Sequence, residues 1–251
     1  MSASGENEGR MPVDNLIRTW DDDILSITLN RSERGNSLDT QTVEDLLDAL
    51  EQAKVRSCAV MILNGAGRNF CTGFDLSDLD TVSDPDLLYR FVRIELLLQS
   101  LYHAPFPIVV LAKGRSFGAG VDIVCACSDR IATPDAQFRM PGWRFDLALG
   151  TRRLAGRIGA DRARAILRDA AEFSARDALA WGMLTELAEE SAWPATVRAA
   201  HAKWSAISAT ARQHLLALTA CDTRAADLAD LVRSASRPGL RQRIADYRAK
   251  G

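Results

Sequence analysis

Two glycine-rich turns carry the residues of this chain that are best suited to chemistry. Each follows an apolar run typical of a buried strand: the turn 70–76 (FCTGFDL) follows the run 59–64, and the turn 114–122 (GRSFGAGVD) follows the run 107–112. Glycine permits backbone dihedrals and close approaches that side chains exclude. The amides after such a turn are free at a helix start and can point at one negatively charged oxygen. Two turns converging on one carbonyl would form an oxyanion hole.

The rest of the chain alternates strand-like and helical patterns, which predicts a β/α body followed by a helical tail. The charged stretch 77–85 predicts a mobile segment. Strands are predicted at 24–29, 59–64, 107–112, 130–133 and 184–187. Helices are predicted after Asp39, over 87–102, from about 120, over 154–168, and over 175–181 behind Ser174. From about 193 onward the chain is predicted to be helical, with a break at Pro238-Gly239.

Composition narrows the class of protein. A chain of 251 residues fits one large domain, and its net charge of −2 gives no reason to expect nucleic-acid binding. The polar start and the lack of a long apolar run predict a cytoplasmic protein that binds no membrane. An odd number of cysteines without a CxxC pair favours reduced, buried thiols, and the spacing of three histidines suggests no metal site.

Six segments, in chain order, resemble the crotonase (enoyl-CoA hydratase/isomerase) superfamily over about residues 13–250. They are 30–38 (NRSERGNSL), Gly73-Phe74-Asp75, Gly118-Ala119-Gly120, 135–138 (DAQF), Met140-Pro141, and 174–178 (SARDA) with Trp181-Gly182. The resemblance implies an α/β fold of the ClpP/crotonase type, a spiral of ββα units with a C-terminal helical trimerisation region. It divides the chain into a disordered tail 1–12, a core 13–192 with an acyl-CoA site, and a helical region 193–251.

The resemblance also implies the ligand and its assembly. Family members bind acyl-CoA thioesters as a homotrimer or a dimer of trimers, and coenzyme A enters only as part of the substrate, so no separate cofactor is expected. Two backbone amides hold the thioester oxygen and stabilise an enolate. By position these amides fall on Phe74 and Ala119, where the bulky side chain of Phe74 could narrow the acyl pocket.

The acid/base positions depart from the hydratase pattern. Asp122 stands where hydratases carry the first glutamate, and Gly142 stands where they carry the second. Hydration usually needs two such groups, so isomerisation or another reaction of a thioester enolate is favoured over hydration. Asp122 either moves the proton or only stabilises the start of its helix. Asp146 is the other candidate carboxylate, with a loop or capping role as its alternative.

Further residues are predicted to contact the substrate. By resemblance these are Arg34, Cys71, Gly73, Asp75, Leu76, Gly118 and Gly142, with Trp143 as a candidate wall of the acyl pocket. Arg34 would contact the coenzyme A diphosphate or else lie in solvent. Trp143 and Phe145 would line the pocket or pack in the core. Arg139 and Arg144 would meet a substrate carboxylate, the coenzyme A phosphates, or solvent.

A second class of function stays open on the sequence alone. The missing second glutamate favours a catalytically impaired acyl-CoA-binding protein that retains only the oxyanion hole. The carboxylate at Asp122 argues against that alternative.

Overall fold

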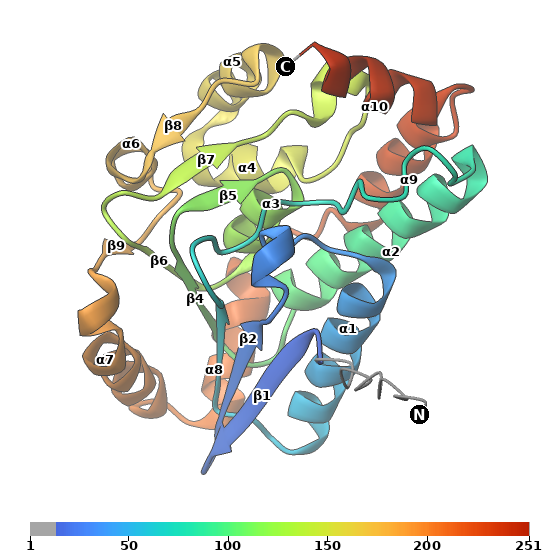
Figure 1. Cartoon of the computed structure of the whole chain (residues 1–251). Helices are drawn as coiled ribbons and strands as arrows, with labels where there is room; N and C mark the ends of the chain where they lie inside the picture. The colour runs from blue at the N-terminus through green and yellow to red at the C-terminus, as the bar shows by residue number, and fades with distance from the viewer. Residues whose placement is uncertain (1–13, 251) are drawn as a thin grey trace, which may run out of the picture.

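The computed structural model describes residues 14–250, and the predicted disordered tail 1–12 lies outside these described residues. The chain forms a main six-stranded sheet in the order β1-β2-β3-β4-β6-β9 and a smaller sheet in the order β5-β7-β8 (Figure 1). The strands are β1 (Leu16–Asp21), β2 (Ile24–Leu29), β3 (Val60–Gly65), β4 (Ile108–Ala112), β5 (Arg115–Phe117), β6 (Asp129–Ala132), β7 (Gln137–Arg139), β8 (Phe173–Ser174) and β9 (Glu186–Leu187).

Helices cover both faces of the main sheet and extend beyond it. They are α1 (Thr40–Val55), α2 (Asp84–Tyr102), α3 (Ala119–Ala126), α4 (Thr151–Ile158), α5 (Ala160–Asp169), α6 (Ala175–Ala180), α7 (Trp193–Ser205), α8 (Ala209–Thr219), α9 (Arg224–Ala235) and α10 (Leu240–Ala249). Within residues 14–250, three 3-10 turns complete the elements: η1 (Ser32–Arg34), η2 (Gly142–Phe145) and η3 (Glu190–Ala192).

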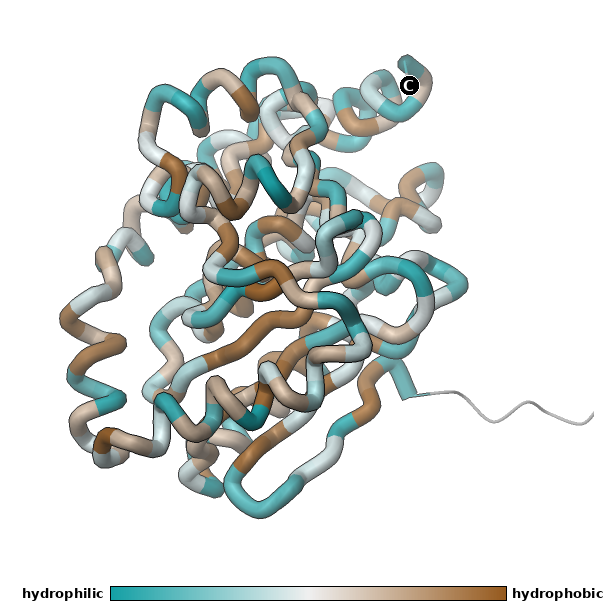
Figure 2. The backbone as a smooth tube through the Cα atoms, turned by 90° about the vertical axis from the view of Figure 1, so that its left-hand side faces the viewer, coloured by the Kyte–Doolittle hydropathy of each residue, from teal (hydrophilic) through white to brown (hydrophobic). Residues whose placement is uncertain are grey.

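The parallel strands at the centre are apolar because both of their faces are buried. Alternate residues of β3 point to opposite sides: Met61 and Leu63 join the main core, while Val60 and Ile62 pack with Trp193 of α7. In Figure 2, segments of hydrophobic residues run through the middle of the molecule, and hydrophilic segments lie mostly around them.

Two predicted boundaries were wrong. The stretch predicted as mobile contains the start of α2, because Ser83 caps that helix by accepting the N–H of Asp86 at 3.3 Å, and Val82 before it is buried. The predicted helix 154–168 is two helices, since Gly159 at φ 83° interrupts the chain between α4 and α5. The capped helix behind Ser174 and the helical tail are confirmed.

The last helix is fixed to the body by one carboxylate. Asp84, the first residue of α2, accepts the backbone N–H groups of Gly239, Leu240 and Arg241 at 2.8, 3.1 and 2.8 Å. One side chain thus satisfies three of the free donors at the start of α10. The hydrogen bond from Arg241 is the main cause that lowers the pKa of Asp84 below its ordinary value.

We predict that Asp84→Ala lowers the free energy of unfolding by about 1–2 kcal/mol, the usual cost of losing a helix cap. Because the pKa of Asp84 is lowered in the folded state, its contribution is present above the ordinary carboxyl pKa and disappears as the pH falls through the lowered value. Urea unfolding at neutral pH measures the loss. Asp80→Ala is the matched control, since Asp80 is exposed and offers only its backbone carbonyl to α10. An equal loss in both variants would contradict the capping role.

Candidate active site

The two glycine turns meet at Cys71. Cys71 and Ser116 form a parallel bridge, and the N–H of Phe117 donates to the carbonyl of Cys71 at 3.0 Å. A Cβ atom on Gly120 would lie 2.2 Å from that same carbonyl oxygen, and one on Gly73 would lie 2.6 Å from the carbonyl oxygen of Phe117. Only glycine fits at these two positions, so the close approach that the sequence suggested is realised here.

The amides of Phe74 and Ala119 are both free to bind a ligand. Leu38 pairs with the first turn by donating to the carbonyl of Gly73 (2.7 Å) and accepting from Asp75 (3.1 Å), which leaves the N–H of Phe74 facing away from Leu38. Ala119 is the first residue of α3, where N–H groups lack a helical partner. Within residues 14–250, neither N–H donates to a protein acceptor.

Both amides open onto one cavity of about 220 Å³. Its walls are mostly apolar and come from both turns, η2, α2, α5 and α10. They include Phe74, Leu76, Phe91, Ala119, Asp122, Arg139, Pro141, Gly142, Trp143, Phe145, Leu147, Leu149, Leu167, Ile244 and Tyr247. The rings of Phe74 and Phe91 stack with centroids 4.4 Å apart, so the side chain of Phe74 forms one wall of the cavity.

Asp122 is the one carboxylate among the described residues that line this cavity. Its side chain is buried, and its Oδ1 atom has no hydrogen-bond partner. A Cβ atom on Gly150, at φ 64°, would lie 1.5 Å from that oxygen, so glycine at this position makes room for the carboxylate. Burial raises the pKa of Asp122 to about 7, opposed by nearby Arg153.

A buried ion cluster lies near Asp122 and was missed by the sequence reasoning. Arg153 of α4 donates to Glu95 of α2 (Nη1–Oε1, 3.0 Å) and approaches Asp227 of α9 at 3.4 Å. All three residues are buried. Their two carboxylates raise the pKa of Asp122 further, while the guanidinium of Arg153 lowers it. The only sequence signal was Glu95 at the edge of an apolar helical stripe.

The loop after Pro141 carries three predicted site residues, and only two of them line the cavity. Gly142 begins η2, and Trp143 lines the cavity while its Nε1 donates to Thr151 Oγ1 at 3.0 Å. Asp146 adopts φ 58°, its side chain is 52% exposed, and its nearest cationic partner is Arg237 at 3.6 Å. The structure therefore brings Asp122, but not Asp146, into the cavity with the two free amides.

The predicted coenzyme A contacts lie on the first loop and turn. Arg34 is exposed at the end of η1, and Leu76 lines the cavity. Gly118 precedes α3 with a positive φ of 50°. Burial would raise the pKa of Asp75, but hydrogen bonds from Ser77 and Arg31 lower it to about 2. Asp75 thus stays ionised and holds the first loop through Arg31.

The side chain of Cys71 is buried. Burial raises the pKa of its thiol to about 12, which keeps it protonated at neutral pH and makes it a poor nucleophile. Among residues 14–250, no group of three or more histidine, cysteine, aspartate or glutamate side chains is arranged to hold a metal ion. None of the helices in this part of the chain is both long and apolar enough to cross a membrane.

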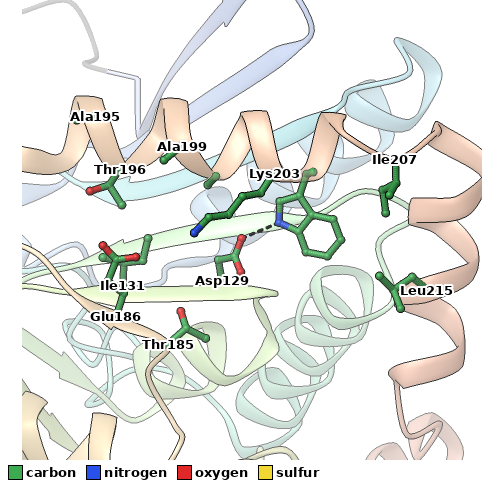
Figure 3. A pocket seen from close by; sticks show the side chains of 12 residues that line it. Asp129, Ile131, Thr185, Glu186, Ala195, Thr196, Ala199, Lys203, Ile207 and Leu215 are labelled. Carbon is green, nitrogen blue, oxygen red and sulfur yellow. Dashed lines mark hydrogen bonds between the residues drawn. The ribbon is translucent and has the colours of Figure 1, made fainter.

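A wider groove of about 660 Å³ lies between the last two strands of the main sheet, β6 and β9, and the helices α7 and α8 (Figure 3). It holds none of the predicted site residues. Asp129 of β6 accepts the indole N–H of Trp204 there at 2.7 Å, which connects α7 to the sheet.

Comparison with known proteins agrees with this architecture. The chain has the crotonase fold: it superposes on an enoyl-CoA hydratase/isomerase structure from Bordetella parapertussis with a TM-score of 0.93, at 42% identity and over 94% of this chain and 99% of that one. A family model described as enoyl-CoA hydratase/isomerase matches residues 19–233. The chain therefore belongs to the enoyl-CoA hydratase/isomerase family and is an acyl-CoA-binding enzyme of that family.

Curated relatives carry names of more than one reaction. A probable enoyl-CoA hydratase of Mycobacterium tuberculosis is 36% identical over 181 residues, covering 69% of this chain and 72% of that protein. The 1,2-epoxyphenylacetyl-CoA isomerase of Escherichia coli is 30% identical over 175 residues, covering 66% of this chain and 67% of that protein.

We predict that Asp122→Asn changes the pH dependence of stability. The folded carboxyl has a pKa of about 7 and the unfolded one stays near 3.8, so the folded state of the unchanged protein binds the extra proton between these values. Its free energy of unfolding therefore falls as the pH rises from about 4 to about 7. Asparagine does not titrate, so the variant lacks this decrease. Melting temperatures of the two proteins across this range should diverge in favour of Asp122→Asn. A constant difference would contradict the raised pKa.

Proposed function

We propose that this protein isomerises unsaturated acyl-CoA thioesters through an enolate held between the amides of Phe74 and Ala119. Asp122 removes a proton from the acyl chain and returns it at another carbon. The observation that carries this proposal is the meeting, in one cavity, of two free amides and a single buried carboxylate with a pKa of about 7.

The amides supply the electrostatic part of the reaction. When the C2–H bond of a 3-enoyl thioester breaks, its electron pair moves onto the thioester oxygen. Two N–H donors fixed by the crossing at Cys71 would stabilise that charge without rearranging. The loss of one such donor typically costs roughly a hundred- to a thousand-fold in rate.

Asp122 supplies the proton transfer. A group whose pKa lies near neutrality is ionised often enough to accept a proton and acidic enough to return it. The carboxylate takes the proton from C2 and gives it to C4. The double bond thereby moves from the C3–C4 position to the C2–C3 position. One carboxylate serves both steps, so this reaction needs no second acid.

The second acid is absent where hydration would need it. Gly142 lines the cavity without a side chain, and Asp146 lies outside the cavity. A water molecule attacking C3 would lack the second positioned group that hydratases use. Isomerisation therefore fits the residues present better than hydration does.

The runner-up is an acyl-CoA-binding protein with impaired catalysis. The lack of a hydrogen-bond partner for Asp122 Oδ1 favours the enzyme. An unpaired buried oxygen costs stability, and a catalytic role explains why a protein keeps one. The trimeric assembly and the cytoplasmic location remain predictions from the resemblance and from composition.

Isomerisation is tested with trans-3-hexenoyl-CoA in D₂O, with mass spectrometry following conversion to the 2-enoyl isomer and deuterium uptake. We expect the rate to rise with pH to a plateau above about 7, because the carboxylate form of Asp122 is the base. Asp122→Asn should slow both readouts by roughly 10²- to 10⁴-fold, the usual contribution of a general base.

Asp146→Asn discriminates between the two carboxylates that the sequence offered. Activity lost in Asp146→Asn and kept in Asp122→Asn would overturn the assignment. Tight binding of hexenoyl-CoA by the unchanged protein without any exchange would favour the binding protein. Hydration of crotonyl-CoA faster than isomerisation would contradict the role given to Gly142.

A further inference from the structure

A second depression adjoins the acyl cavity, between η2, the end of α5 and α10. It has a volume of about 560 Å³ and shares Arg139, Phe145 and Tyr247 with the cavity. We call it the cationic groove, because four of its lining side chains are basic. Its other lining residues are Arg144, Asp146, Asp169, Arg243, Asp246 and Lys250.

The basic side chains of the cationic groove lack carboxylate partners. Among the described residues, no carboxylate oxygen lies within 4.0 Å of a side-chain nitrogen of these four. Arg139 donates through Nε to the carbonyl of Ala170 at 3.0 Å, and Arg243 donates only to backbone carbonyls, such as that of Phe145 at 3.1 Å. A carbonyl orients a guanidinium but does not neutralise it.

Two of the three acidic side chains of the cationic groove pair with arginines that lie outside it. Asp169 forms a two-pronged pair with Arg168 at 2.8 and 2.7 Å, and Asp146 approaches Arg237 at 3.6 Å. Asp246 accepts from a glutamine one turn earlier in α10 at 2.7 Å. The four basic side chains of the groove outnumber its three acidic ones, and two of those three pair with arginines outside the groove.

Arg139 connects this charge to the reacting centre. Its backbone carbonyl accepts the N–H of Gly118 at 2.7 Å, and it pairs with Phe117 between β7 and β5. The side chain thus begins beside the turn that presents the amide of Ala119. It is partly buried, it lines both the cavity and the groove, and its two terminal nitrogens donate to no described residue. A planar guanidinium fork in this setting suits a carboxylate bound through two hydrogen bonds.

We propose that the acyl group carries a distal carboxylate and that Arg139 binds it. The substrates are then coenzyme A thioesters of dicarboxylic acids. This inference rests on the proposed function for the placement of the thioester at the two amides. The apolar walls of the cavity hold the methylene carbons, and the carboxylate lies at the border with the cationic groove.

The test compares matched pairs of ligands that differ only at the far end of the acyl chain. Succinyl-CoA is measured against butyryl-CoA, and adipyl-CoA against hexanoyl-CoA, by titration calorimetry on the full chain. In at least one pair we expect the dicarboxylic ligand to bind tenfold or more tightly. Arg139→Gln should abolish that preference while leaving butyryl-CoA and hexanoyl-CoA within about threefold, and Arg139→Lys should retain part of it because only the fork is lost.

Arg164→Gln is the matched control, because Arg164 is an exposed arginine of α5 outside the cavity and the groove. Retained binding of butyryl-CoA shows that a variant is folded. Equal weakening of both members of a pair by Arg139→Gln would mean that Arg139 contacts the coenzyme A phosphates and would overturn the proposal. So would the absence of any preference in the unchanged protein. Binding is measured without turnover. A failure of deuterium exchange alone would therefore contradict the proposed isomerisation but not the preference for dicarboxylic ligands.

Discussion

The site depends on the close crossing of two backbone turns at Cys71. The carbonyl of Cys71 accepts the N–H of Phe117, and Gly73 and Gly120 approach the opposing backbone so closely that neither could carry a Cβ atom. This contact sets the positions of the amides that follow each turn. The strands before the turns are almost entirely buried, so the amides are held in place before any ligand arrives. Such preorganisation is the condition for effective electrostatic stabilisation.

The second constraint is the burial of Asp122 against Gly150. A carboxylate without a partner is costly in such a place, so the group is held as a neutral acid until the pH approaches 7. The cluster of Arg153, Glu95 and Asp227 modulates this cost, since its guanidinium favours the charged form and its carboxylates oppose it. A perturbed pKa beside a ligand cavity is typical of a functional group rather than a structural one.

The sequence predicted what is local and missed what is brought together by tertiary packing. The glycine turns, the placement of Asp122 at a helix start and the capped helix behind Ser174 follow from short patterns, and the structure contains all three. Glu95 and Arg153 are 58 positions apart in the sequence, so no local pattern predicts that they pair. Asp146 was the next candidate by proximity to Gly142, yet its backbone is left-handed and its side chain is half exposed to solvent.

In the proposed complex, one thioester oxygen lies between the amides of Phe74 and Ala119 while Asp122 faces the acyl chain. A crystal structure of the protein with a bound, unreactive acyl-CoA tests this arrangement most directly. We expect the oxygen to lie about 2.7–3.1 Å from both nitrogens, and a carboxyl oxygen of Asp122 to be nearer than any other carboxylate to the carbon next to the thioester. A thioester placed away from either amide, or an acyl chain closer to Asp146 than to Asp122, would contradict it.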